Sequence, residues 1–329
     1  MASPPTMGSA PANTYTQAGA SGTVHEDVSD IINRIDPETT PFVSSLGRDP
    51  AAQTLHEWLV QDLNSAQDVP QPEGFTAVMS PARKPARLGN ICQIFTRTVA
   101  VSGTLRAVDS IGGEDEYNRQ LVLRGIELRR DLELVATSAV AKTATDPRHM
   151  AGLPTFCTNG SRGAGAGVMP VGDGSNAGTA GTARDLTLDM VNNAMQQAWN
   201  AGGEPTFAVM SGNIKNYFAT LSQGGTGNPI AAQNIVQASP TGQLTIQGAV
   251  DIYRTNFGTL QLAPDRFMPA NNILLVDKNY VSLSPLPGRD FIEQQYAVTG
   301  DNSQGGLLFE GTLTVNAPKA HAWIADLNQ

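Results

Sequence analysis

The stretch GEDEYNRQLVLRGIELRRDLELVATSAVAKTA, residues Gly113–Ala144, decides the fold, because about thirty residues pass without a proline. Its acidic opening suits the positive end of a helix dipole, and its apolar side chains recur at helical spacing. A helix over this range would be roughly 45 Å long. Such a length is typical of a long supporting helix, a beam, that packs one apolar face against a core. The apolar positions are Tyr117, Leu121, Leu128, Leu132, Val135 and Ala139, with Val122 and Ile126 beside them.

The opposite side of this helix carries charges between Glu127 and Glu133, which we expect on the surface, supported by pairs three or four residues apart. Gly125 is the weak position, because glycine costs about 1 kcal/mol relative to alanine inside a helix. It predicts close packing or a bend at that point.

The composition is that of a large folded protein, and it argues against binding to nucleic acid or insertion in a membrane. The 329 residues, 40% hydrophobic, can bury a substantial core. A formal net charge of -9 argues against electrostatic binding of nucleic acid. No segment approaches the roughly 18 apolar residues of a membrane span, and no signal peptide is visible, so we expect a soluble chain made in the cytoplasm. Cys92 and Cys157 are expected to be free thiols.

The N-terminal third predicts an arm followed by a long hairpin. Residues 1–22 are small and polar, so we expect them to be mobile. A short amphipathic helix is predicted from Val24 to Ile35, and residues 35–46 form a buried anchor. Strand patterns at 54–62 and 88–103 flank a proline-rich run, which predicts an extended hairpin too long to bury itself.

The remainder predicts a mixed α and β arrangement. Asn159–Arg184 is rich in glycine and alanine, so we expect a flexible surface insertion. A capped helix is predicted from Thr187 to Ala201 and a second from Asn213 to Leu221. Strands are predicted at 206–210, 244–255, 259–263, 273–277, 280–284, 291–298, 307–316 and 320–324.

No motif demands catalysis, a metal or another cofactor. The four histidines lack the paired spacing of metal ligands, and the glycines at 163, 165 and 167 fit neither a Walker loop nor a dinucleotide fingerprint. The carboxylates Glu114–Glu116 are explained by a helix start. We therefore expect a non-enzyme with no cofactor or metal site. A glycine-rich hydrolase is the alternative from another class.

Short blocks in a fixed order resemble the major head proteins of SU10-type tailed phages, which have the HK97-type capsid fold. The resemblance extends from about Val24 to Leu327, and the glycine-rich insertion has no counterpart in it. The blocks include Ile35-Asp36-Pro37, Thr40-Pro41-Phe42, Glu57-Trp58, Glu73-Gly74, Asn90, Gln93-Ile94-Phe95, Val101-Ser102-Gly103-Thr104, Glu127 to Glu133, Asn256-Phe257-Gly258-Thr259 with Arg266, Thr299-Gly300-Asp301 and Glu310-Gly311-Thr312-Leu313.

The resemblance implies an α+β fold with a defined division of the chain. The divisions are an arm and anchor (1–53), an extended hairpin loop (54–104), a peripheral domain with its spine helix (105–158, helix 113–144), the glycine-rich insertion (159–184), an axial domain (185–287) and returning peripheral strands (288–329).

The resemblance also implies function and partners. Copies would form pentamers and hexamers of an icosahedral virion shell around double-stranded DNA, without sequence-specific binding and without a membrane. A portal protein, a separate scaffolding protein and a decoration protein are the expected partners. An encapsulin-type compartment is the alternative with the same fold. Predicted subunit contacts are Trp58, Arg83, Lys84, Arg87, Phe95, Arg129 and Arg130.

Overall fold

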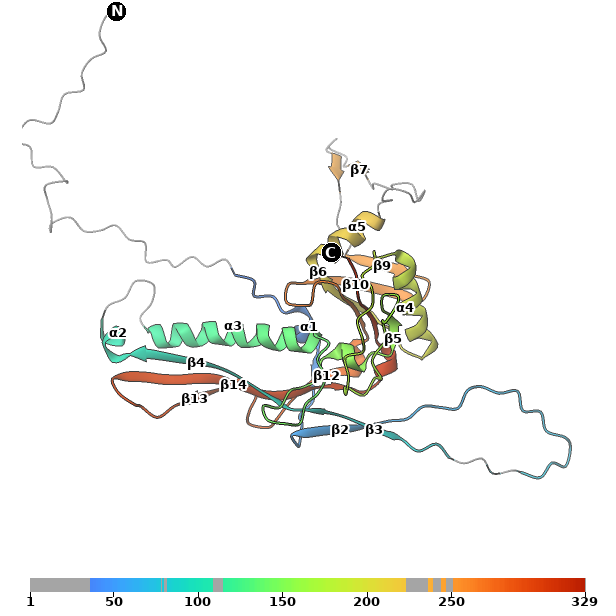
Figure 1. Cartoon of the computed structure of the whole chain (residues 1–329), viewed down its shortest axis with the longest axis horizontal. Coiled ribbons are helices and arrows are strands. Elements are labelled where there is room, and N and C mark those ends of the chain that lie inside the picture. The colour runs from blue at the N-terminus through green and yellow to red at the C-terminus, as the bar shows by residue number, and fades with distance from the viewer. Residues whose placement is uncertain are drawn as a thin grey trace, which may run out of the picture.

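The computed structural model describes residues 36–77, 79, 82–108, 115–222, 236–238, 244–246 and 251–328. The predicted arm and the helix predicted from Val24 to Ile35 lie outside these residues. Within them, a long flat body runs along the helix α3, a more compact body stands at one end of it, and a loop projects beyond (Figure 1).

The helix α3 spans Glu116–Thr137 and is the predicted beam, though shorter. Asp115 caps it, because its side chain accepts the N–H of Tyr117 at 3.0 Å. The helix ends where Ser138 turns into an extended conformation, so the prediction that it continues to Ala144 is wrong. Gly113 lies outside the described residues.

A five-stranded sheet lies along α3, with the long strand β14 at its centre. β4 pairs with β14 along one edge, from Ser102 opposite Asn302 to Gln93 opposite Gly311. On the other edge lie β12 and β13, and β1 extends the sheet in parallel beside β12. The strands are β1 (Gly47–Arg48), β4 (Gln93–Ser102), β12 (Val281–Pro285), β13 (Ile292–Gln295) and β14 (Asn302–Val315).

The predicted hairpin needs correction at its second strand. Cys92 separates β3, Ala86–Ile91, from β4. Only β3 pairs with β2, Leu55–Val60, whereas β4 belongs to the five-stranded sheet. The single strand predicted at 88–103 therefore serves two sheets. The chain changes partner at Cys92, whose N–H donates to the Thr54 carbonyl at 2.7 Å.

A six-stranded sheet forms the compact body, in the order β5-β15-β11-β6-β10-β9. Helix α4 is capped by the Thr187 hydroxyl, as the sequence predicts, and it packs on β5 and β15. The elements are β5 (Asn159–Ser161), α4 (Leu188–Asn200), β6 (Phe207–Ser211), α5 (Gly212–Ser222), β9 (Ile252–Thr255), β10 (Gly258–Asp265), β11 (Ile273–Val276) and β15 (Ala322–Ile324).

The two sheets exchange strands at points that differ from the predicted boundary at residue 287. The chain leaves the six-stranded sheet after β11 and enters the five-stranded sheet at β12. It returns at β15, next to the C-terminus. The remaining elements are α1 (Pro41–Ser45), α2 (Gly103–Ala107), the 3-10 turns Leu153–Phe156, Lys278–Tyr280 and Pro318–Ala320, and the strand pair β7 (Val236–Ala238) and β8 (Leu244–Ile246).

The prediction of a flexible insertion at 159–184 is wrong, because this glycine-rich segment is packed into the fold. It contributes β5 to the six-stranded sheet. The Asp326 carboxylate accepts the N–H groups of Gly163 and Gly181 at 3.0 and 2.8 Å. A side chain on Gly163 would collide with the backbone of Thr182. The glycines here allow close backbone contact rather than flexibility.

The core is continuous from α3 to the six-stranded sheet. Leu128 and Leu132 of α3 pack with Phe309 of β14 and with Trp323 of β15 in one buried cluster. A second cluster lies between the far face of the six-stranded sheet and the helices α4 and α5. A Cβ on Gly125 would meet the Leu307 side chain at 3.2 Å, so close packing accounts for this glycine.

Candidate subunit-contact surfaces

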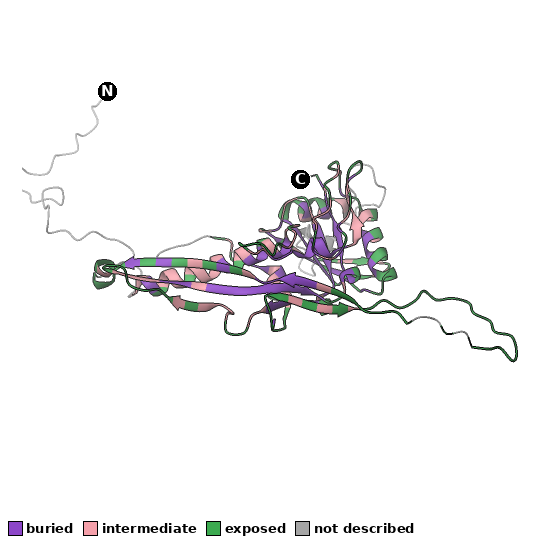
Figure 2. Ribbon diagram, turned by 60° about the horizontal axis from the view of Figure 1, so that its bottom comes forward, coloured by how far each residue is buried: buried purple, intermediate pink, exposed green. Residues whose placement is uncertain are grey.

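The loop of residues 61–85 projects from the molecule, and we call it the projecting loop (Figure 1). Its described residues are exposed, as the green trace in Figure 2 shows. Four of these residues expose large apolar side chains by more than half, which is unusual for a surface that faces only water. They are Leu63 at 89%, Val69 at 66%, Phe75 at 54% and Met79 at 89%.

The base of the projecting loop is fixed by pairing and packing. Val60 and Ala86 face each other as the last pair of the β2–β3 ladder. The Trp58 ring packs on Phe156, with centroids 6.0 Å apart. Asn90 is fully buried, and its amide donates to the carbonyls of Ala151 and Leu313. The loop thus starts from a rigid ladder rather than from a flexible hinge.

Charged tethers hold the base to the compact body. The Lys319 ammonium donates to the Asp62 carboxylate at 2.5 Å, and this contact lowers the pKa of Asp62. Lys142 donates to the carbonyl of Gly89 at 2.6 Å and to that of Asp173 at 2.8 Å. The glycine-rich segment therefore supports the hairpin, a role for which its composition gave no signal.

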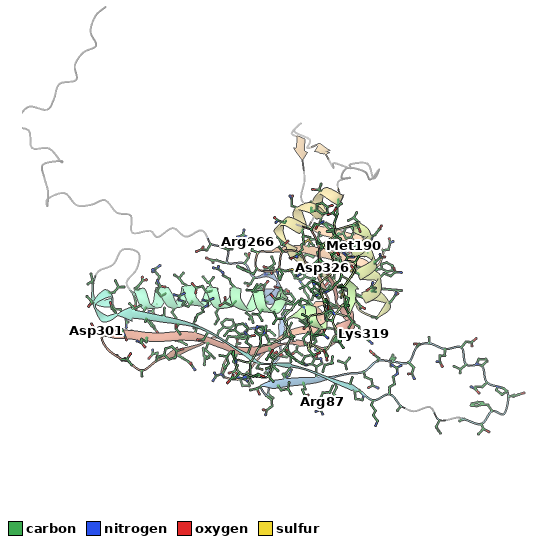
Figure 3. All side chains as sticks on the ribbon, in the orientation of Figure 1. Arg87, Met190, Arg266, Asp301, Lys319 and Asp326 are labelled. Carbon is green, nitrogen blue, oxygen red and sulfur yellow. The ribbon has the colours of Figure 1, made fainter. Side chains whose placement is uncertain are left out.

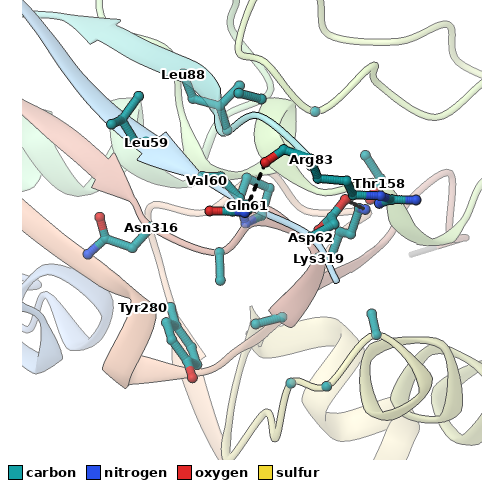
Figure 4. Close-up of a pocket in the computed structure, with 18 of the residues that line it drawn as sticks. Leu59, Val60, Gln61, Asp62, Arg83, Leu88, Thr158, Tyr280, Asn316 and Lys319 are labelled. Carbon is teal, nitrogen blue, oxygen red and sulfur yellow. Dashed lines mark hydrogen bonds and ion pairs between the residues drawn. The ribbon is translucent and has the colours of Figure 1, made fainter. Parts of the chain in front are cut away.

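A cleft of about 530 Å³ lies between the base of the projecting loop and the compact body. Figure 4 shows the Gln61 amide donating to the Arg83 carbonyl across it, at 3.2 Å. The Asp62–Lys319 tether crosses one side. Apolar walls and three cations meet here, lined by Leu59, Leu88, Val171, Arg83, Lys84 and Lys319.

The three cations predicted for subunit contacts lie together at the base of the projecting loop. Arg83 and Lys84 are exposed and line the cleft. Arg87 projects from β3, where it faces the Glu57 carboxylate at 3.4 Å (Figure 3). Neither Arg83 nor Lys84 forms an ion pair among the described residues.

The two aromatic residues predicted for subunit contacts face the interior of their own chain. Phe95 exposes only 6% of its surface and packs against Phe309 in the main cluster. Trp58 is half-buried over Phe156. Because these rings already stabilise the subunit, little of either remains for a neighbour.

The sequence predicts that the charged residues of α3 lie on the surface, and only some of them do. Arg129 is exposed, with its guanidinium 5.7 Å from the centroid of the Phe291 ring, and Arg130 lies 5.3 Å from that of Phe267. Asp131 binds Arg97 of β4. Glu133 is fully buried, so its predicted surface position is wrong.

The burial of Glu133 cannot be predicted from helical spacing alone. Its carboxylate accepts the N–H groups of Phe42 and Val43 at 2.7 Å each, at the start of α1. The partners lie some ninety residues away in sequence, which no local pattern reveals. The one local signal nearby is the proline at position 41, which favours the first position of a helix. The structure adds that this helix start has no side-chain cap of its own.

The described part of the chain contains no cluster of three or more histidine, cysteine or acidic side chains arranged to hold a metal ion. No helix within the same residues has the length and apolarity to cross a membrane. Cys92 and Cys157 are both buried free thiols, and burial raises the pKa of Cys92 to about 11.

Solved structures with a similar fold are phage capsid proteins and a related shell. A capsid structure of cyanophage A-1(L) matches with a TM-score of 0.66 and 14% identity, covering 96% of this chain and 100% of that one. The holo-SrpI encapsulin complex of Synechococcus elongatus PCC 7942 matches with a TM-score of 0.55 and 13% identity, covering 92% and 93%. At these identities the likeness shows the fold, which is the HK97-type capsid fold.

Sequence comparison identifies the family. The major capsid protein of Escherichia phage Phieco32 is 32% identical over 113 residues, which cover 34% of this chain and 32% of that protein. The aligned part thus spans about a third of this relative. The model of the SU10 major capsid protein family matches residues 10–328, nearly the whole chain. The chain belongs to the SU10 major capsid protein family, a family of structural proteins and not of enzymes.

Proposed function

We propose that copies of this chain assemble into pentamers and hexamers, which close into the icosahedral shell of a tailed-phage head around double-stranded DNA. The observation that carries this proposal is the projecting loop, whose apolar side chains stay more than half exposed among the described residues of their own subunit. Laid across an adjoining subunit, they would be removed from water. Repetition of such a heterologous contact by a rotation that closes produces a ring.

The charges at the base of the projecting loop support the same arrangement. Arg83 and Lys84 line the cleft with no ion pair among the described residues, and the chain as a whole carries a net charge of -9. An acidic surface on a neighbour would therefore complement them. Because rim charges contribute little affinity, they would mainly select the correct register between subunits.

The exposed arginine Arg129 and its neighbour Arg130 are proposed as further contacts along the spine helix. Both guanidinium groups lie over aromatic rings of their own subunit, which holds them in position. Held in this way, each group loses little freedom when it binds a carboxylate on a neighbour. Phe95 and Trp58 have no part in this proposal, because they pack inward.

The partners beyond the chain itself are proposed from the family. We infer a portal protein at one vertex, a separate scaffolding protein during assembly, and a decoration protein on the finished shell. The packaged DNA needs no specific site, since a net negative wall repels it and prevents sticking. Synthesis in the host cytoplasm and incorporation into the virion complete the proposal.

Electron microscopy of the purified chain tests the proposal, with sedimentation as a second measurement. We expect closed shells or capsomer rings, and a protein that remains monomeric at all concentrations would contradict assembly. An encapsulin-type compartment would also give shells, but it would contain protein cargo. Shells isolated from infected cells should therefore contain DNA, and a protein cargo in its place would favour the alternative.

A further inference from the structure

Two buried carboxyl groups, each acting on the pKa of the other, lie beside α1, which contacts both α3 and β10, and we call them the carboxyl pair. Glu133 of α3 is fully buried and binds the N–H groups of Phe42 and Val43. Asp265, the last residue of β10, exposes 1% of its surface. One of its oxygens accepts the N–H of Phe267 at 2.9 Å, and the other has no donor within the described residues.

No cation neutralises the carboxyl pair among the described residues. α1 contributes two N–H groups and no charged side chain to this site. Arg129 and Arg130 of α3 lie over aromatic rings, and Arg266, which follows β10 and is labelled in Figure 3, is exposed to solvent. The other charged groups near Glu133, α1 and Asp265 in the sequence are Asp36, Glu38, Arg129, Arg130, Asp131 and Arg266.

Two carboxylates in a buried site without a cation cannot both ionise at neutral pH. One proton shared between them leaves a single negative charge, and it allows one carboxyl to donate to the other. Burial is the largest cause that raises the pKa of Glu133 to about 8, with the neighbouring Asp265 as a further one, and together they outweigh the N–H groups of Val43 and Phe42, which lower it. Burial also raises the pKa of Asp265. The remaining negative charge suits the two N–H groups at the start of α1.

We propose that the carboxyl pair is a pH-sensitive latch on α1: the shared proton keeps α1 docked against the spine helix, and loss of that proton releases it. α1 leads from residues 36–40 into β1, which pairs with β12 at the edge of the five-stranded sheet. Release would therefore change how residues 36–45 are held against α3 and β10. The latch is a property of the folded subunit and does not depend on shell assembly.

The direction of the pH dependence follows from the raised pKa. In the unfolded chain, Glu133 has its ordinary pKa of 4.5, whereas in the folded chain the value is about 8. The folded state therefore holds an extra proton between these pH values. Its stabilising contribution is complete below pH 4.5 and is lost as the pH rises through about 8, so the latch opens on the alkaline side.

Hydrogen exchange of the full-length protein at pH 7 and pH 9 tests the latch. Once the intrinsic pH effect on exchange is removed, protection of the Phe42 and Val43 amides should fall about tenfold between these pH values, because the protonated fraction falls by about that factor. The buried amide of Leu274 in β11 should stay protected and serves as a reference. Equal protection of Phe42 and Val43 at both pH values would overturn the proposal.

A variant separates the shared proton from general alkaline loosening. Asp265→Asn replaces one carboxyl by an amide that donates to Glu133 at every pH, so protection of the two α1 amides should no longer change between pH 7 and pH 9. Asp251→Asn, which removes an exposed carboxylate bound to Lys215, should behave like the wild type. A pH response in Asp265→Asn as large as in the wild type would refute the latch.

A measurement on the unmodified protein covers the case in which Asp265→Asn does not fold. The infrared C=O stretch of a protonated carboxylic acid should be present at pH 7 and absent at pH 9. Its absence at pH 7 would show that the pair holds no proton, and the latch would be wrong.

Discussion

Arg97 and Asp131 form a two-point ion pair between β4 and α3, with N–O distances of 2.7 Å at both contacts. The pair fastens the spine helix to the strand that carries the edge of the five-stranded sheet. It also raises the pKa of Arg97, although both side chains remain more than a third exposed. Geometry of this kind specifies the position of a helix more than it adds stability.

Breaking this ion pair should therefore have a small effect on stability. Asp131→Asn should lower the free energy of unfolding by about 1 kcal/mol, and by less at high salt because the added ions screen the pair in the wild type. Urea denaturation of the unassembled protein at two salt concentrations measures this change in the free energy of unfolding. A loss that does not depend on salt would contradict the assignment.

The apolar stripe of α3 should carry far more stability than its charges. Leu132→Ala removes a fully buried side chain and should cost about 2–5 kcal/mol, because a cavity remains in the core. Val122→Ala is the matched control on the same helix, because Val122, although the spacing places it beside the apolar stripe, is 66% exposed. We expect the control to change the free energy of unfolding by less than about 0.5 kcal/mol.

This stripe also shows what the sequence could predict. The positions Leu128 and Leu132 were identified from helical spacing, and both lie in the core. The α+β class and the family resemblance are confirmed. Glu133 was misplaced because its burial depends on α1, distant in sequence. The glycine-rich segment was misread because the same composition serves both a flexible linker and backbone in close contact, as at Gly163.

The change of pairing partner between β3 and β4 also cannot be predicted from the local sequence pattern. Residues 88–103 alternate like one strand, yet Cys92 divides them between the β2–β3 ladder and β14. Pairing partners are set by the hydrophobic cluster around Phe309, which collects residues from most of the chain. The position of the subunit contacts, apart from the burial of Phe95, remains a prediction.

Buried His321 predicts a loss of stability in acid. Burial lowers its pKa from 6.5 to about 3, so the folded state excludes a proton that the unfolded state binds. Its stabilising contribution is present above pH 6.5 and is lost as the pH falls toward 3. Urea midpoints measured across this range should decline, and His321→Asn should decline less steeply. An identical slope in the variant would show that another group is responsible.

The tether between Lys319 and Asp62 should affect assembly more than folding. Lys319→Ala frees the base of the projecting loop, yet an exposed ion pair contributes about 0.5–1 kcal/mol at most. We expect a nearly unchanged free energy of unfolding and fewer closed shells at equal protein concentration, counted by electron microscopy. Lys215→Ala, which removes another surface ion pair, is the control. If Lys319→Ala and Lys215→Ala gave equal numbers of shells, the contact between Lys319 and Asp62 would have no role in assembly.

The central claim is that the projecting loop joins subunits into shells, and its removal tests this most directly. Val60 and Ala86 face each other in the ladder, so residues 61–85 can be replaced by Asn-Gly, the preferred two-residue turn. Electron microscopy of this variant beside the wild type is the measurement. The account predicts closed shells from the wild type, and a folded variant that forms none. Normal closed shells from the variant would contradict it.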